Sequence, residues 1–245
     1  MIIVNFFRGL FVLILVSFLT PLASLAALVA IFFFRWPPVR VVVFPRTWAR
    51  CILAISGVSV TVEEQEPLDP EQPYIFAANH QSQFDIFALQ GYFKTDFRWL
   101  AKKELFRIPL FGPAMRKSGH ISIDRSHGRK ALLSLKKAAK RISDGTSVII
   151  FPEGTRSWDG QLKPFKPGGM YLAIKAGVPL VPVAIMGTHE ILAKGKCMVR
   201  PGSIVIRVGK PIDTRAFTLK QKQELAETVQ QAVADLMKTA CNYSA

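Results

Sequence analysis

The feature that most limits the fold is a stretch of 26 uncharged residues, Gly9–Phe34, which lies between Arg8 and Arg35. As a helix rising 1.5 Å per residue, it is long enough to cross the ~30 Å hydrocarbon layer of a bilayer. It exceeds the ~7–15-residue apolar core of a cleaved signal peptide, although its Ala-rich end leaves cleavage open as an alternative. We therefore expect residues 1–62 to form a retained membrane anchor with interfacial helices, and residues 63–245 to form a second domain.

The geometry of this anchor is left open by Pro21, which divides the stretch into Leu10–Thr20 and Leu22–Phe34. A kinked span and a re-entrant hairpin in one leaflet both fit two such halves. The segment Pro45–Val58 that follows is either an interfacial helix or an amphipathic core helix. Only Arg8 precedes the stretch, whereas four arginines follow it closely: Arg35, Arg40, Arg46 and Arg50. This asymmetry places the second domain on the cytoplasmic face, which suggests the inner cell membrane.

Beyond a linker expected at Glu63–Pro73, apolar strand-like runs alternate with helix-like patterns. The expected strands are Tyr74–Ala78, His120–Ile123, Ser147–Phe151, Leu180–Met186 and Ile204–Val208, and the expected helices are Phe84–Phe93, Arg129–Ser143, Met170–Ala176 and Leu219–Met237. Such alternation predicts an α/β fold with a mostly parallel sheet flanked by helices.

Charge and cysteine content limit the kinds of partner. Lys and Arg number 32 against 17 Asp and Glu, which gives a net charge of +15 and indicates an anionic partner such as a phosphate or an acidic membrane surface. Nucleic acid is not expected, because no reader motif accompanies the charge. Three dispersed cysteines predict neither a disulfide framework nor a metal site.

The first candidate site pairs His80 with Asp85 in the segment NHQSQFD. Positions five apart point in different directions along a helix, so the two side chains meet only if His80 lies in the turn before the helix. One interpretation makes Asp85 a helix cap, since Ser82 and Asp85 have capping-box spacing. The other has Asp85 orient the imidazole, which then removes a proton from an alcohol.

The second candidate site is FPEGTRS, Phe151–Ser157, at the end of an expected buried strand, where open α/β sheets bind ligands. Gly154 permits a tight turn, and Arg156 offers a planar fork for a phosphate. Glu153 is expected to accept hydrogen bonds from substrate hydroxyl groups or to orient Arg156. The alternative is an ordinary reverse turn with an internal Glu–Arg pair.

Two weaker signals add cations. GHISIDR delivers Asp124 and Arg125 at the end of a short strand, and Lys102 is a further candidate phosphate contact. A surface ion pair and a solvated charge are the respective alternatives. The other histidines are interpreted as structural: His120, His127 and His189.

In this order, NHQSQFD, GHISIDR, FPEGTRS and VPLVPVAI resemble the four ordered blocks of the 1-acylglycerol-3-phosphate (lysophosphatidate) acyltransferase family, with Ser122 in place of the usual aromatic of the second block. The resemblance implies transfer of an acyl chain from acyl-CoA or acyl-carrier protein to the sn-2 hydroxyl of lysophosphatidate, at an anionic membrane surface and without a metal or other cofactor.

The resemblance also implies the roles of individual residues. His80 is the expected general base and Asp85 orients it. The expected contacts to the phosphate and glycerol of the acceptor are Glu153, Gly154, Thr155, Arg156, Arg125 and Lys102. Acylation of another lysophospholipid, a lyso-ornithine lipid or glycerol 3-phosphate stays open, as does a non-catalytic membrane lipid-binding adaptor.

Overall fold

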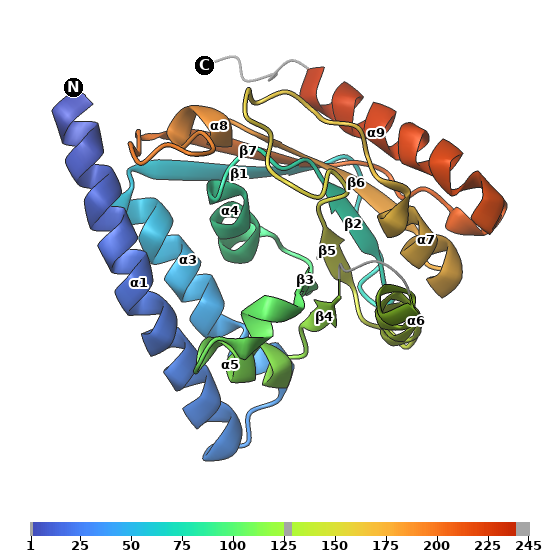
Figure 1. Ribbon diagram of the computed structural model, residues 1–245, viewed down its shortest axis with the longest axis horizontal. Coiled ribbons are helices and arrows are strands. Elements are labelled where there is room, and N and C mark those ends of the chain that lie inside the picture. The colour runs from blue at the N-terminus through green and yellow to red at the C-terminus, as the bar shows by residue number, and fades with distance from the viewer. Residues whose placement is uncertain (1, 125–128, 239–245) are drawn as a thin grey trace.

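The computed structural model describes residues 2–124 and 129–238, which form a seven-stranded sheet with the strand order β1-β7-β6-β2-β5-β3-β4 (Figure 1). The strands are β1 (Val58–Glu64), β2 (Ile75–Ala78), β3 (Arg98–Lys102), β4 (Ile121–Ile123), β5 (Val148–Ile150), β6 (Leu180–Met186) and β7 (Gly202–Val208). The α-helices are α1 (Ile2–Phe32), α2 (Pro38–Val41), α3 (Val43–Ile55), α4 (Phe84–Tyr92), α5 (Phe111–Lys117), α6 (Arg129–Ser143), α7 (Pro167–Ala176), α8 (Thr188–Ile191) and α9 (Lys222–Lys238). Short 3-10 turns span Lys103–Arg107, Thr214–Ala216 and Leu219–Gln221. The predicted fold class is confirmed.

Most of the sheet is parallel. β6, β2, β5, β3 and β4 run in one direction, while β7 pairs antiparallel with β6 and parallel with β1. All four residues of the central strand β2 are buried, which explains its uninterrupted apolar sequence. Because β2, β5 and β3 run parallel to one another, their carboxyl ends meet at one edge of the sheet.

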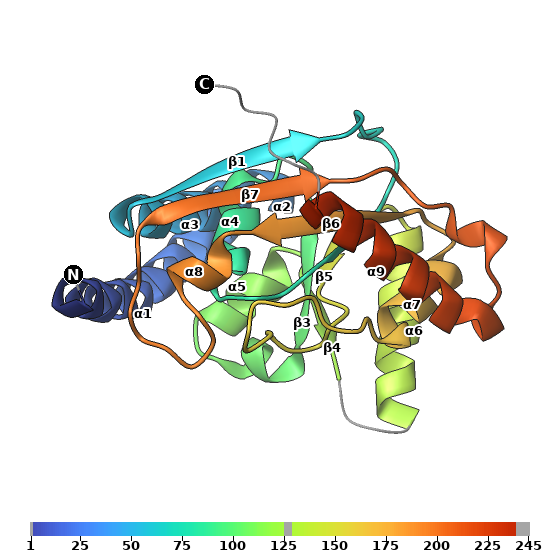
Figure 2. The ribbon, with the colours of Figure 1, turned by 90° about the horizontal axis from the view of Figure 1, so that it is seen from above.

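Helices cover both faces of this sheet (Figures 1 and 2). Successive strand residues point to opposite faces, so Phe76 packs in the cluster with α3 and α4, and Ile75 packs in the cluster with α6, α7 and α9. The basic helix α6 buries only Ala138, Ala139 and Ile142 and leaves its lysines exposed. Two apolar layers thus hold the central strands between them.

Two strands were not expected from the sequence. β1 contains Glu63 and Glu64, so the linker begins after residue 64, and the boundary expected between residues 62 and 63 falls inside a strand. Glu63 is tolerated there because the buried Arg207 of β7 donates Nε–H to its Oε2 at 2.6 Å. β3 went unrecognised because its five residues carry a cation at each end and lack a buried apolar run.

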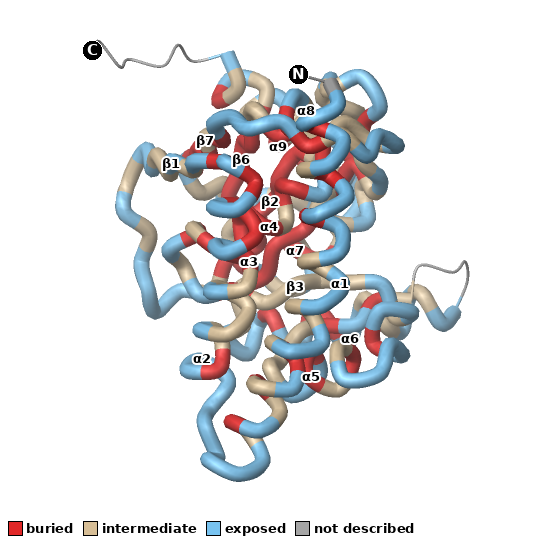
Figure 3. Tube along the Cα trace, turned by 90° about the vertical axis from the view of Figure 1, so that its left-hand side faces the viewer, coloured by how far each residue is buried: buried red, intermediate tan, exposed pale blue. Residues whose placement is uncertain are grey.

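The N-terminal stretch forms a single helix, α1, which continues through Pro21 rather than dividing into two halves. Of the two geometries left open, the re-entrant hairpin is therefore not formed, because one missing N–H does not interrupt the flanking turns. By length and composition Ile3–Phe32 is able to cross a membrane, and half of its residues are exposed (Figure 3). This helix fits membrane association.

α1 also packs against the rest of the chain, alongside α3 and α5. Val12 is buried in the main core cluster. Near its start, the Asn5 carbonyl accepts a bond from the Val199 N–H at 3.2 Å, and a Cβ at Gly9 would overlap the carbonyl oxygen of Cys197. The anchor is thus a docked helix.

Of the two interpretations of Pro45–Val58, the amphipathic core helix is confirmed over Val43–Ile55. α3 buries Ala49, Ile52 and Leu53. Arg50 donates Nε–H to the Gly91 carbonyl of α4 at 2.8 Å. The helix therefore ties α1 to the element that carries Asp85.

Candidate active site

The predicted contact between His80 and Asp85 is formed. His80 lies in the turn after β2, Asp85 lies in the first turn of α4, and 2.7 Å separates Nδ1 of His80 from Oδ2 of Asp85. Asp85 is fully buried, whereas the His80 side chain keeps 14% of its surface exposed. One ring nitrogen therefore faces a buried carboxylate while part of the ring still reaches the surface.

Asp85 has further hydrogen-bond partners. Its Oδ2 accepts the backbone N–H groups of Gln81 and Ser82, each at 2.8 Å, and its Oδ1 accepts the Thr188 hydroxyl at 2.5 Å. Asp85 thus holds the turn that precedes α4 and also faces His80, whereas the N-cap residue of α4, Gln83, forms no side-chain cap bond. The expected capping box is only half formed, because the Ser82 hydroxyl accepts from Phe84 N–H at 3.2 Å instead of from Asp85.

These contacts determine which nitrogen of His80 is basic. A carboxylate only accepts, so Nδ1 carries the hydrogen and Nε2 keeps the lone pair. The ring stacks on Phe151, with centroids 3.9 Å apart and planes inclined by 14°. Both the tautomer and the plane of the imidazole are fixed, as a general base requires.

The main chain of His80 is held by the FPEGTRS segment after β5, which neighbours β2. Glu153 Oε1 accepts the His80 N–H at 2.8 Å, and the Ser157 N–H donates to the His80 carbonyl at 2.9 Å. The two predicted blocks therefore meet at the carboxyl edge of the sheet.

The Glu153 carboxyl group is almost completely enclosed, with 2% of the residue exposed. Burial raises its pKa to about 7, opposed by the His80 N–H bond and the positive charge of Lys163. Among the described residues its Oε2 has no hydrogen-bond partner. The alternative of an internal pair between Glu153 and Arg156 is not among the ion pairs of the described chain.

The next three residues form a turn surrounded by lysines. Gly154 adopts φ +79°, a left-handed conformation that favours glycine, and the Lys166 side chain lies against it. The exposed Thr155 accepts from Lys163 Nζ at 3.0 Å, and the Arg156 carbonyl accepts from Lys194 Nζ at 2.9 Å. In the described part of the chain the Arg156 guanidinium forms no ion pair, which leaves its fork available to a phosphate.

Of the other two cations predicted to contact the phosphate, the structure describes Lys102 but not Arg125. Lys102 is exposed at the carboxyl end of β3, the edge where β2 also ends. Asp124 pairs with Lys103 at 2.7 Å. Arg125 lies outside the described residues, as does His127, so their predicted roles stay predictions.

The structural interpretation of His120 agrees with its surroundings. Its Nδ1 accepts the Trp99 N–H at 3.1 Å, and burial together with the charges of Arg98 and Arg141 lowers its pKa to about 3. A neutral, internally bonded imidazole of this kind supports β3 and takes no part in the site.

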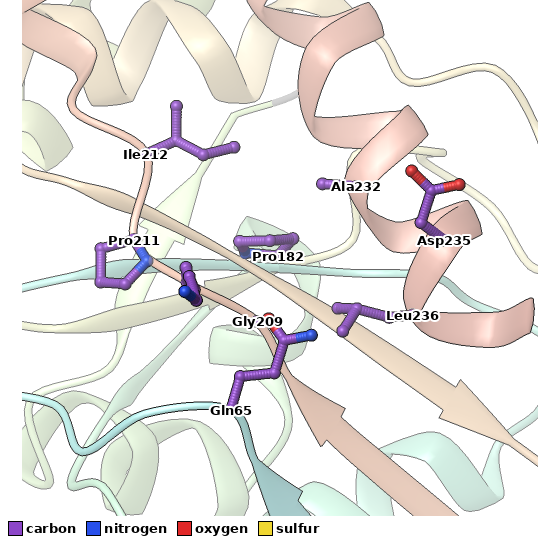
Figure 4. A pocket seen from close by; sticks show the side chains of 9 residues that line it. Gln65, Pro182, Gly209, Pro211, Ile212, Ala232, Asp235 and Leu236 are labelled. Carbon is purple, nitrogen blue, oxygen red and sulfur yellow. The ribbon is translucent and has the colours of Figure 1, made fainter. Parts of the chain in front are cut away.

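Two cavities lie away from the dyad. One of about 310 Å³ lies beside α9 and is lined by Pro182, Ile212 and Leu236 among others (Figure 4). The other, about 690 Å³, is lined by Arg98 and Ser147 at the amino ends of β3 and β5. Neither cavity is lined by a predicted site residue. The candidate active site is therefore located by the contacts of His80, Asp85 and Glu153 and not by a cavity.

Sequence reasoning missed Thr188, Lys194 and the stacking role of Phe151. Thr188 lies 103 positions from Asp85 and only three residues after the fourth block, so proximity to that block was the available signal. Lys194, also positioned 4.2 Å from the Trp158 ring, has no motif around it. Thr188 begins α8 and Lys194 lies in the loop after α8; both follow the carboxyl end of β6, which runs parallel to β2 and so ends at the same edge of the sheet.

Comparison with known proteins supports a family assignment. The family model described as Acyltransferase matches residues 59–186, just over half of the chain. A 1-acyl-sn-glycerol-3-phosphate acyltransferase of Limnanthes douglasii is 32% identical over 82% of this chain and 73% of its own length, and one of Chlamydomonas reinhardtii is 35% identical over 76% of this chain. The chain spans 55% of the length of the latter.

The fold has a solved counterpart. The crystal structure of PlsC, the 1-acyl-sn-glycerophosphate acyltransferase of Thermotoga maritima, superposes with a TM-score of 0.80 at 26% identity and covers 99% of both chains. The matched model includes His80, Asp85 and the segment Phe151–Ser157. This chain therefore belongs to the acyltransferase family that includes the 1-acyl-sn-glycerol-3-phosphate acyltransferases.

Proposed function

We propose that this chain transfers a fatty acyl group from a thioester to the sn-2 hydroxyl of lysophosphatidate and so forms phosphatidate. The observation that carries the proposal is the buried Asp85 bonded to Nδ1 of His80, which leaves Nε2 free to act as a base. The relatives named as acyltransferases of 1-acyl-sn-glycerol-3-phosphate support this acceptor.

The reaction follows from this geometry. Nε2 of His80 removes the proton of the hydroxyl as its oxygen attacks the thioester carbonyl carbon. The C–S bond then breaks, and the imidazolium returns the proton to the departing thiolate. A positioned general base contributes about 10²–10⁴-fold, or ~3–5 kcal/mol of barrier. A thioester already has a good leaving group, so the proposed reaction needs no metal or redox cofactor.

The cations around Gly154–Arg156 are the proposed site of the acceptor phosphate. Arg156 supplies the bidentate fork, and Arg125 and Lys102 are proposed further contacts, with Thr155 at the rim of the turn. Two donors fit this chemistry equally, acyl-CoA and acyl-carrier protein, since both present the acyl group as a thioester. The glycerol contact predicted for Glu153 is one of two roles for this carboxyl group, and the kinetics described below separate it from a role through His80.

The proposed location is the cytoplasmic face of the inner membrane. Acceptor and product both carry acyl tails, so the site must open toward lipid. The exposed apolar surface of α1 provides the insertion, and nearly all of the net charge of +15 lies beyond residue 34, where it can attract anionic headgroups.

The test is a panel of acceptors and donors with detergent-extracted protein. Lysophosphatidate is expected to be preferred over glycerol 3-phosphate, a lyso-ornithine lipid and other lysophospholipids. His80→Ala is expected to abolish transfer without unfolding the protein, whereas an adaptor would keep its function. Arg156→Ala is expected to raise KM for lysophosphatidate by about 10-fold or more and to leave the donor KM unchanged. No preference for lysophosphatidate, or a loss of donor binding in Arg156→Ala, would contradict the corresponding assignment.

A further inference from the structure

The main chain of His80 is held on both sides by one turn. Glu153 Oε1 accepts the N–H of His80, and the Ser157 N–H donates to its carbonyl. These two bonds fix the peptide groups that flank His80 and therefore fix the direction of its Cα–Cβ bond. The imidazole ring is then held at its Nδ1 edge by Asp85, and one of its faces stacks on Phe151.

The environment of Glu153 suits a role through His80 better than a role on substrate. Only 2% of the residue is exposed, and its Oε1 accepts the His80 N–H at 2.8 Å. Lys163, the nearby cation, instead bonds the Thr155 hydroxyl. Burial raises the pKa of Glu153 to about 7, and an oxygen able to accept the His80 N–H is present whether or not the carboxyl group is protonated.

We infer that Glu153 is a positioning residue, whose carboxyl group holds the His80 turn so that the imidazole stays against Asp85 and Phe151. This inference rests on the proposed acyl transfer and assigns Glu153 to the catalytic base in place of the glycerol of the acceptor. Without the carboxyl oxygen, the His80 N–H loses its acceptor in a buried site and the turn must shift.

Kinetics separate the two roles of Glu153. Glu153→Ala is expected to lower kcat by about 10- to 100-fold, because a misplacement of about 1 Å has effects of that size, with KM for lysophosphatidate within about twofold of the original protein. Glu153→Gln keeps an oxygen acceptor and is expected to restore kcat to within about threefold of the original. Glu227→Ala, which removes an exposed carboxylate from α9, is the matched control.

A second readout does not depend on turnover. A ring 3.9 Å from a parallel aromatic ring has its proton signals displaced upfield by the ring current of its neighbour. With selectively labelled histidine, the signal absent from His80→Ala identifies His80 among the four histidines of the chain. The displacement is expected in the original protein and in Glu153→Gln, and is expected to diminish in Glu153→Ala.

The outcomes are distinct. An acceptor KM that rises about 10-fold or more in Glu153→Ala with kcat preserved would show that Glu153 binds the glycerol and would overturn the inference. An unchanged His80 signal in Glu153→Ala would also overturn it. If the original protein fails to acylate lysophosphatidate while the signals behave as expected, the proposed function fails and the positioning role stands.

Discussion

Asp85 shows how one carboxylate can serve two roles that the sequence presents as alternatives. The half of the capping box that forms and the catalytic role both require an oxygen directed at the turn before α4, and Asp85 accepts from His80, Gln81 and Ser82 there. The spacing of His80 and Asp85 predicts their meeting because both belong to one strand–turn–helix unit. The Thr188 contact was not predictable in this way, since it depends on β6 lying beside β2.

Thr188 provides a test at this scale. Its buried hydroxyl donates to Asp85 Oδ1 at 2.5 Å, so Thr188→Val leaves a buried carboxylate oxygen without that donor, at a cost of about 1–3 kcal/mol. We expect kcat to fall by about 10-fold, with KM for the acceptor little changed. Thr188→Ser keeps the hydroxyl group and should recover most of the loss. Equal kcat in the Val and Ser variants would mean that this bond does not position Asp85.

Glu153 makes stability depend on pH. Its pKa is raised from 4.5 to about 7 in the folded chain, so between these values the folded state binds a proton that the unfolded state has released. The free energy of unfolding therefore falls as the pH rises from about 4.5 to about 7, by up to about 3 kcal/mol at ~1.4 kcal/mol for each pKa unit. Thermal unfolding of the original protein and of Glu153→Gln at pH 5 and pH 8 measures this contribution. Their difference in stability should move in favour of Glu153→Gln at pH 8, and a difference independent of pH would contradict the raised pKa.

At the scale of elements, burial on both faces decides which strands are visible in the sequence. β2, β5 and β6 have buried, almost purely apolar residues, and their ranges were predicted closely. β1 buries only Val58 and ends in two glutamates, and β3 has no buried residue. Such strands depend on a partner strand, which a single sequence does not identify.

The partner that stabilises β1 is Arg207 of β7. Arg207 is 5% exposed, donates Nε–H to Glu63, and donates Nη1–H to the Leu236 carbonyl of α9 at 2.9 Å. Arg207→Leu removes both bonds and leaves Glu63 without its cation, so we expect a loss of about 2 kcal/mol in stability. Glu63→Gln keeps an acceptor and should cost less. Thermal unfolding checks the order, and equal midpoints for the original protein and Arg207→Leu would show that the pair contributes nothing to the pairing of β1 with β7.

At the scale of the whole molecule, the single helix α1 has an exposed apolar side and a side that packs against the rest of the chain. Composition predicts that Gly9–Phe34 is apolar, but it does not reveal that α1 lies along α3 and α5, because that packing uses a few small residues on one side of the helix. Gly9 is the closest of these contacts, where the helix meets the carbonyl of Cys197. α1 is therefore packed against the rest of the chain through α3 and α5.

Gly9 tests this connection. A leucine at this position would overlap the Cys197 carbonyl, so Gly9→Leu should force the start of α1, including Asn5, away from the loop that contains Cys197 and Val199. Binding to lipid vesicles should persist, because the exposed apolar surface of α1 is unchanged, while thermal stability falls and trypsin cleaves faster at Arg35. Phe11→Leu alters an exposed position of the same helix and serves as the control. If trypsin cleaves Gly9→Leu and Phe11→Leu at the same rate, the contact of Gly9 with the Cys197 loop does not hold α1 in position. The docking of α1 against the domain would then be ruled out as the cause of its placement.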